Sequence, residues 1–130
     1  MTTPIDLVYV RDEESYSDGE VIFEEGGFSD WLYIILEGQV KITKNTPKGQ
    51  VTTARLRQGD FLGEIEFLDP GKQPRAATAT AIGEVRLGVM DRDKLQREYE
   101  SLSPAFRKII RSLARRSRRT ALIAARLAIS

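Results

Sequence analysis

The sequence predicts a mainly β domain closed by C-terminal helices, and two observations in the first ninety residues support the β part. Short runs rich in Val, Ile, Thr, Tyr and Phe recur there, and several alternate apolar with polar side chains: EVIFEE, WLYIILEG, QVKITKN, VTTARL and EVRLGVM. Glycines from Gly27 to Gly83 recur at intervals of 10 to 12 residues, and most are expected to form turns. Short strands between regularly spaced turn residues are typical of a sandwich or barrel.

The character of the chain changes after Met90, and helical signals begin there. Asp91 is placed to cap a helix through RDKLQREYE. Ser103 followed by Pro104 predicts the start of a second helix, with a capping hydroxyl and then proline at the first helical position. The sequence is therefore divided into a β-domain over residues 1–90 and C-terminal helices over residues 91–130.

The second helix carries an apolar or small residue at alternating steps of four and three, which is a heptad pattern. The positions are Phe106, Ile110, Leu113, Ser117, Thr120, Ala124 and Leu127. One interpretation is a helix that packs on its own β-domain near its start and on the same helix of a second copy later, giving a homodimer. The alternative is a helix that only covers its own barrel.

Composition restricts the function. Cysteine and histidine are absent, so no thiolate metal site and no histidine base can exist, and we expect no catalytic residue and no metal ligand. No apolar run is long enough to span a membrane, the first residues lack a secretory signal, and the expected location is the cytoplasm. Residues 101–130 carry eight Lys/Arg and no acid, whereas residues 1–100 carry 12 basic and 19 acidic residues. This basic tail pairs with the acidic body, or binds nucleic acid or another acidic partner.

One stretch, GEIEFLDPGKQPRAATATA from Gly63 to Ala81, is unlike an ordinary strand or helix. Gly63 permits a close approach of backbone to ligand. Residues 64–68 are long enough for about one helical turn, whose first amides are free to bind an anion. Arg75 is a donor suited to phosphate, and the small Ala76 and Ala77 leave their amides approachable. An acid beside such an anion pocket suits a ligand that carries hydroxyls next to its phosphate.

This stretch resembles the phosphate-binding cassette of cyclic nucleotide-binding domains, here residues 63–77 with the motif GEIEF…PRAAT. The resemblance extends upstream through GEVIFEEGGFSDWLYIILEGQVKI and LRQGDFLGE, and covers roughly residues 16–128. It implies a jelly-roll β-roll, or double-stranded β-helix, followed by an α-helical tail. It also implies a regulatory domain that senses a cyclic nucleotide, is not an enzyme and needs no cofactor.

The resemblance implies the role of each matching residue. Glu64 would accept a hydrogen bond from the ribose 2′-hydroxyl, and Arg75 would pair with the cyclic phosphate. The amides of Gly63, Ile65 and Ala76 would complete the phosphate shell, with Ala77 beside them. Relatives that prefer cGMP often carry threonine after the arginine, so Ala76 favours cAMP over cGMP. The tail also looks like the dimer helix of catabolite-activator-like regulators, and this likeness makes Thr120 the candidate contact to the base.

Two departures from the family pattern affect the site. The loop at residues 69–74 is longer than in many relatives, and Glu66 stands where the family usually carries glycine or alanine. A carboxylate about 5 Å from an anion costs roughly 3 kcal/mol at an effective dielectric near 20, about a hundredfold in affinity. Either Lys72 offsets this charge or Glu66 points to water.

The output of the domain has several readings. The first is a sensor that passes its signal to a protein partner. The second is a degenerate interaction module that binds no nucleotide, because Glu64 and Arg75 form an ion pair within its pocket. A third reading is the sensor part of a transcription regulator. The helix-turn-helix domain of such regulators has no counterpart in these residues, so direct DNA binding is not expected of them. Trp31, Tyr33, Phe23 and Phe61 are expected in the core rather than against a base.

Overall fold

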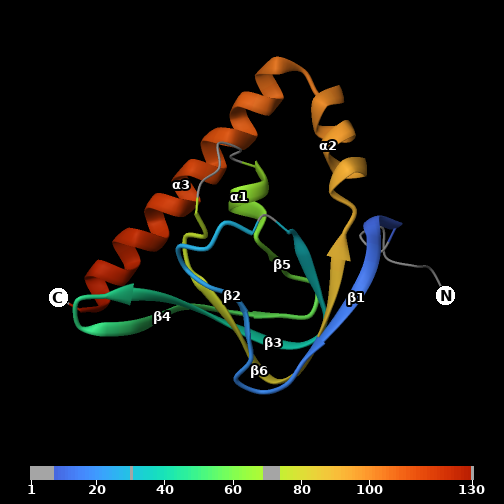
Figure 1. The fold of residues 1–130 in the computed structure, drawn as a ribbon. Helices are drawn as coiled ribbons and strands as arrows, with labels where there is room; N and C mark the ends of the chain where they lie inside the picture. The colour runs from blue at the N-terminus through green and yellow to red at the C-terminus, as the bar shows by residue number, and fades with distance from the viewer. Residues whose placement is uncertain (1–7, 30, 69–73, 130) are drawn as a thin grey trace.

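The computed structural model describes residues 8–29, 31–68 and 74–129. The elements in this part of the chain are, in order (Figure 1), β1 (Val10–Tyr16), β2 (Val21–Phe23), β3 (Tyr33–Thr46), β4 (Gly49–Arg57), β5 (Phe61–Leu62), α1 (Glu64–Leu68), β6 (Thr78–Met90), α2 (Arg92–Ser101) and α3 (Pro104–Ala128). The last strand thus ends at Met90 and the helices of the tail follow it directly.

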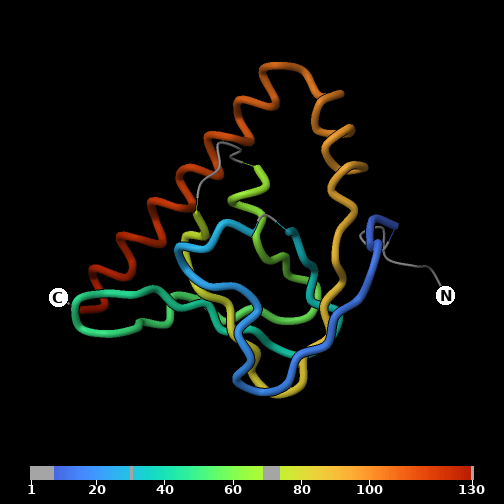
Figure 2. Tube along the Cα trace, viewed as in Figure 1, coloured from blue at the N-terminus to red at the C-terminus, as the bar shows by residue number. Residues whose placement is uncertain are grey.

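The described strands form one antiparallel sheet. Its main path runs β1-β6-β3-β4, while β2 pairs with β6 and β5 pairs with β3. In Figure 2 the trace of the strands curves into a roll, and α2 and α3 stand above it as the two arms of an inverted V. The predicted fold class, a jelly-roll β-roll followed by an α-helical tail, is confirmed, although the strands do not close into a complete barrel.

Two runs expected as separate strands, WLYIILEG and QVKITKN, form the single long strand β3. Gly38 lies inside this strand rather than in a turn, with a φ of 96°. A Cβ at Gly38 would lie 2.4 Å from the carbonyl oxygen of Glu84 on β6, so only glycine allows the two strands to pass this closely. The pairing of β3 with β6 shifts register on either side of Glu37. Gly38 is therefore an exception to the expectation that most of these glycines form turns.

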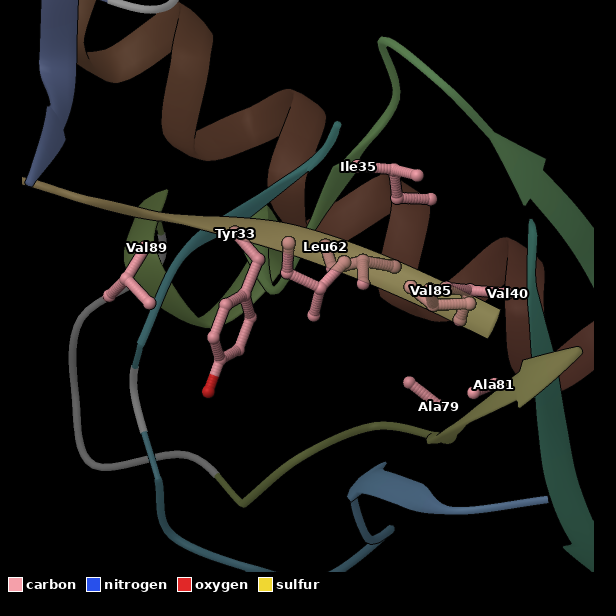
Figure 3. Packing of buried hydrophobic residues seen from close by; sticks show 9 residues of the cluster. Tyr33, Ile35, Val40, Leu62, Ala79, Ala81, Val85 and Val89 are labelled. Carbon is pink, nitrogen blue, oxygen red and sulfur yellow. The ribbon is translucent and has the colours of Figure 1, made fainter. Parts of the chain in front are cut away.

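The core lies on the inner, concave face of the curved sheet. Its buried members are Tyr33, Ile35, Val40, Leu62, Ala79, Ala81, Val85, Leu87 and Val89 (Figure 3). Val85, Leu87 and Val89 share one face of β6, as the alternation in the sequence predicts. Residues 32–35 are all buried because the other face of this segment packs in a second cluster, where Leu32 and Ile34 lie with partly buried Phe67 of α1 and Leu95 of α2.

Both predicted helix starts are confirmed. The Asp91 side chain accepts a hydrogen bond from the Lys94 amide at the start of α2, and the Ser103 hydroxyl accepts one from the Phe106 amide at the start of α3. Pro104 occupies the first helical position of α3. These local signals succeed because a cap and its helix depend only on residues three or four positions apart.

Helix α3 lies across the open side of the β-domain with its middle and end, not with its start. It contacts α1, β4 and β3, and its buried residues are Ala114 and Ala125. Lys48, in the turn between β3 and β4, donates to the Ile129 carbonyl at 2.9 Å, so the end of α3 is tied to that hairpin. Phe106 and Ile109 near the start are exposed. The interpretation in which the start of α3 packs on its own β-domain is therefore wrong, and the homodimer stays a prediction.

The sequence patterns did not indicate β1, whose residues VRDEESY are mostly charged. It is the edge strand beside β6, and all but its two end residues are exposed. Charged side chains suit such an edge because they discourage pairing with other chains. None of the helices in residues 8–29, 31–68 and 74–129 is long and apolar enough to cross a membrane.

Candidate functional site

The cassette begins with a sharp turn at Gly63 that leads into α1. Gly63 has a φ of 85°, a conformation that other residues adopt only with strain. A Cβ at this position would lie 2.5 Å from Nη1 of Arg75 and 2.6 Å from the carbonyl oxygen of Trp31. The missing side chain therefore makes room for a guanidinium against the backbone. The predicted helical turn over residues 64–68 is confirmed as α1, which lies beneath α3 in Figure 1.

Arg75 is among the most deeply buried side chains of the described chain, with 1% of its surface exposed. Its guanidinium donates to the Ser29 hydroxyl at 3.2 Å, to the Trp31 carbonyl at 2.7 Å and to Oε1 of Glu66 at 3.0 Å. The carbon of the guanidinium also lies 4.1 Å from the centre of the Phe23 ring, a cation–π distance. A buried arginine needs such partners, because an unpaired charge at this depth is costly.

Glu66 joins this arginine to α3. Its side chain is only 6% exposed, and its other oxygen lies 3.7 Å from Nη2 of Arg118 on α3. Arg118 also donates to the carbonyl of Pro74, directly before Arg75, at 3.1 Å. The expectation that Glu66 points to water is wrong, because two arginines hold it inside. Lys72, the other proposed partner of the charge, and most of the loop at 69–74 lie outside the described residues.

A cavity of about 400 Å³ lies between the cassette, β4 and α3, a size suited to a small organic ligand. The residues that line it are Phe23, Ile42, Thr53, Ala54, Leu56, Phe61, Leu62, Gly63, Glu64, Ile65, Glu66, Ala76, Ala77, Ser117, Thr120, Ala121 and Ala124. Most of these side chains are apolar. The cassette contributes the carboxylates, whereas β4 and α3 contribute the hydroxyls.

Glu64 is the carboxylate at the head of α1. Burial raises its pKa above the ordinary value of 4.5, and the neighbouring Glu66 and Asp60 raise it further. A hydrogen bond from its own backbone amide and the nearby Arg75 act in the opposite direction. A half-buried acid at the wall of an apolar cavity can accept hydrogen bonds from ligand hydroxyls.

A lysine from the sheet, Lys44, holds the C-terminal end of the cassette. Lys44 of β3 donates to the carbonyl of Ala76 at 2.6 Å and lies 3.5 Å from the carboxylate of Glu25. The amide of Glu25 in turn donates to the Thr78 hydroxyl at 2.9 Å. These bonds fix the backbone of residues 76–78 against the body of the sheet, next to Arg75.

The structure brings most of the predicted ligand-binding residues to one place. Gly63, Glu64, Ile65, Ala76, Ala77 and Thr120 all line the cavity. Arg75 does not, although Gly63, Glu66 and Phe23 contact it and do line the cavity, so its guanidinium lies one layer behind the wall. The alternative of an emptied pocket proposed an ion pair between Arg75 and Glu64. In the structure Arg75 pairs with Glu66 instead.

The prediction of a core role holds for some of the aromatic residues and not for others. Tyr33 is in the core, and partly buried Phe23 packs against it while also lining the cavity, whereas Phe61 lines the cavity and Trp31 is 44% exposed. Ser29, Ser117 and Arg118 were not recognised as parts of the site. Their contacts join segments far apart in the sequence, and no local pattern marks them.

The fold and this cassette define a class of protein. The chain belongs to the cyclic nucleotide-binding domain family, whose profile matches residues 13–101. Among curated proteins it is 41% identical over 103 residues to a CRP-like cAMP-activated global transcriptional regulator of Mycobacterium tuberculosis, covering 78% of this chain and 45% of that protein. It is 36% identical over 97 residues to a cAMP-dependent protein kinase regulatory subunit of Dictyostelium discoideum, covering 72% of this chain and 29% of the subunit. The chain thus spans less than half the length of these relatives.

Solved structures agree with this assignment. The cAMP-bound form of the EAL enzyme Bd1971 matches with a TM-score of 0.79 and 26% identity, over 91% of this chain and 31% of that one. The N-terminal domain of a transcriptional regulator from Streptomyces coelicolor matches with a TM-score of 0.59 and 32% identity, over 84% of this chain and 76% of that one. The relatives named as a transcriptional regulator and as a kinase regulatory subunit are regulatory proteins.

Proposed function

We propose that this chain is a cyclic nucleotide sensor that binds cAMP in the cavity between the cassette and α3. The observation that carries the proposal is the convergence of five cassette residues on one cavity that α3 covers: Gly63, Glu64, Ile65, Ala76 and Ala77. Relatives whose names refer to cAMP support the choice of ligand. Ala76 after the arginine favours cAMP over cGMP.

Each side of the cavity has its own task in this proposal. Glu64 accepts hydrogen bonds from the ribose, and Arg75 supplies the positive charge for the cyclic phosphate. The apolar wall of Phe61 and Leu56 covers the base, and the Thr120 hydroxyl of α3 contacts its polar edge. Because α3 forms part of the wall, ligand binding shifts its position to the extent that the ligand prefers one arrangement over the other. A homodimer through α3, or a protein partner, receives this signal.

Calorimetry tests the proposal. The 130-residue chain is titrated with cAMP, with cGMP, and with 5′-AMP, which has the same base and sugar but an open phosphate. We expect cAMP to bind most tightly. Arg75→Gln is expected to abolish binding, and Arg97→Gln, which changes an exposed arginine on α2, serves as the matched control. Circular dichroism checks that each variant is folded.

One observation favours a second candidate function, an interaction module that binds no nucleotide. Arg75 is fully buried and its guanidinium is engaged by Glu66, as expected of a pocket whose charge is satisfied internally. Absence of heat and of a thermal shift at millimolar cAMP and cGMP would favour this candidate over the sensor. Comparison of the two outcomes therefore needs only the wild-type protein.

A further inference from the structure

The pair of arginines around Glu66 leads to an inference that rests on the proposed function and concerns its regulation. We propose that Glu66 is a built-in counter-ion that competes with the ligand phosphate for Arg75, and that it passes to Arg118 of α3 when the phosphate binds. The ligand thereby draws α3 onto the cassette through an exchange of ion pairs. Glu66 thus sets both the affinity for cyclic nucleotide and its coupling to α3.

The first step is that Glu66 already occupies the donor that a phosphate needs. Its Oε1 lies 3.0 Å from Nη1 of Arg75, and the two side chains are 6% and 0% exposed. The other two nitrogens donate to the Ser29 hydroxyl and to the Trp31 carbonyl, and neither of these acceptors carries a charge. Glu66 lines the cavity and is the only carboxylate among these three partners. It is therefore the partner whose place an incoming anion takes.

The second step is that Arg118 is poised to receive the released carboxylate. Its Nη2 lies 3.7 Å from Oε2 of Glu66, within ion-pair distance but beyond a hydrogen bond. Within the described chain, Nε and Nη2 of Arg118 are buried and have no hydrogen-bond partner. Buried guanidinium donors without a partner are rare and costly. A shift of roughly 0.8 Å would bring this pair to the ordinary charge-assisted distance near 2.9 Å.

The third step is the balance of charge. Arg75 and Arg118 bring two positive charges to this spot, and Glu66 brings one negative charge. A cyclic phosphate diester carries one further negative charge, so two anions then match two cations. Among the phosphate, Arg75, Glu66 and Arg118, the exchange leaves no charge unpaired: the phosphate pairs with Arg75 and Glu66 pairs with Arg118. Without Arg118 the released Glu66 would be buried beside a second anion, at the cost already noted for like charges.

The coupling to α3 follows from the position of Arg118. This residue also holds the Pro74 carbonyl at 3.1 Å, so it joins α3 to both ends of the cassette. Strengthening its pair with Glu66 pulls α3 toward α1, which it already contacts. The device needs no contact between α3 and the nucleotide, and it acts in addition to any contact from Thr120.

A double-mutant cycle on the whole chain tests the exchange, with cAMP affinity measured by calorimetry for wild type, Glu66→Gln, Arg118→Gln and the double variant. Glutamine keeps an acceptor for Arg75 but removes the charge, so we expect E66Q to bind cAMP about tenfold or more tightly. R118Q should bind about tenfold more weakly than wild type, yet change the affinity of E66Q by less than about threefold. Simple repulsion between Glu66 and the phosphate would also produce a gain in E66Q, so the exchange is tested by whether the loss in R118Q depends on Glu66.

Matched controls are Glu13→Gln, from the exposed pair with Arg86, and Arg116→Gln, an exposed arginine on the same helix. Hydrogen exchange of residues 104–129 gives a second readout, in which cAMP protects α3 in wild type and protects it less in E66Q. If wild type binds cAMP and E66Q binds it equally or more weakly, the exchange is refuted and the proposed function stands. If neither wild type nor E66Q binds any nucleotide, the proposed function itself fails and the exchange falls with it.

Discussion

Substitution of Gly63 by alanine tests how the turn before α1 positions Arg75. Alanine at a φ of 85° costs about 1–2 kcal/mol in backbone strain. The new methyl group would also lie 2.5 Å from Nη1 of Arg75 and 2.6 Å from the Trp31 carbonyl oxygen, so the guanidinium or the backbone must move. Overpacking of this kind costs about 1–3 kcal/mol. We expect a total loss of about 2–5 kcal/mol.

The assay is urea unfolding followed by the fluorescence of the single tryptophan, Trp31, together with cAMP calorimetry. Gly19→Ala is the matched control, because Gly19 has a φ of 82° and a Cβ there meets nothing among the described residues within 4 Å. This control carries the backbone strain without the contact with Arg75. The reasoning is refuted if Gly63→Ala is no more destabilising than Gly19→Ala, or if it binds cAMP as tightly as wild type.

Three further predictions concern the acid of the cassette, its lysine anchor and the start of α3. Burial raises the pKa of Glu64, so the folded protein holds the carboxyl proton more tightly than the unfolded chain does. The protonated carboxyl therefore adds to the free energy of unfolding below pH 4.5, and this contribution is lost as the pH rises through the raised pKa. Urea titrations of wild type and Glu64→Gln measure this contribution as the difference between their free energies of unfolding, wild type minus variant. We expect this difference to fall as the pH rises over this range, and a difference that rises with pH would contradict the assigned burial. Lys44→Met removes the donor to the Ala76 carbonyl and should weaken cAMP binding about tenfold by calorimetry. Lys41→Met, on the same strand, is the control and should leave the affinity unchanged. Equal effects of the two substitutions would show that the bond from Lys44 to Ala76 is unimportant for binding. Ser103→Ala should lower the free energy of unfolding by about 1 kcal/mol in urea, and an unchanged value would mean that the cap contributes nothing.

The features that could be predicted from sequence are those with local signals. The caps at Asp91 and Ser103 and the turn of residues 64–68 each depend on neighbours a few positions away. The motif GEIEF…PRAAT spans a single segment of chain, and Glu64, Ala76 and Ala77 within it line one cavity, while their role in ligand binding stays a prediction.

The features that could not be predicted depend on distant contacts. Arg75 meets Ser29 and Trp31 across more than forty positions, and Arg118 meets Pro74 and Glu66 at similar separations. Sequence reasoning considered Lys72 or water as the partner of Glu66, and missed that Arg75 and Arg118 both lie within ion-pair distance of it. Phe61 was assigned to the core but lines the cavity, because strand position alone does not tell a core from a cavity wall.

The central claim is that the cavity beside the cassette receives a cyclic nucleotide whose phosphate reaches Arg75. A crystal structure of the chain grown with cAMP tests it most directly. The account predicts density for the phosphate within hydrogen-bond distance of Arg75, the ribose at Glu64, and Glu66 turned to Arg118. Density for cAMP elsewhere, or none at saturating ligand with Arg75 still bonded to Glu66, would contradict it.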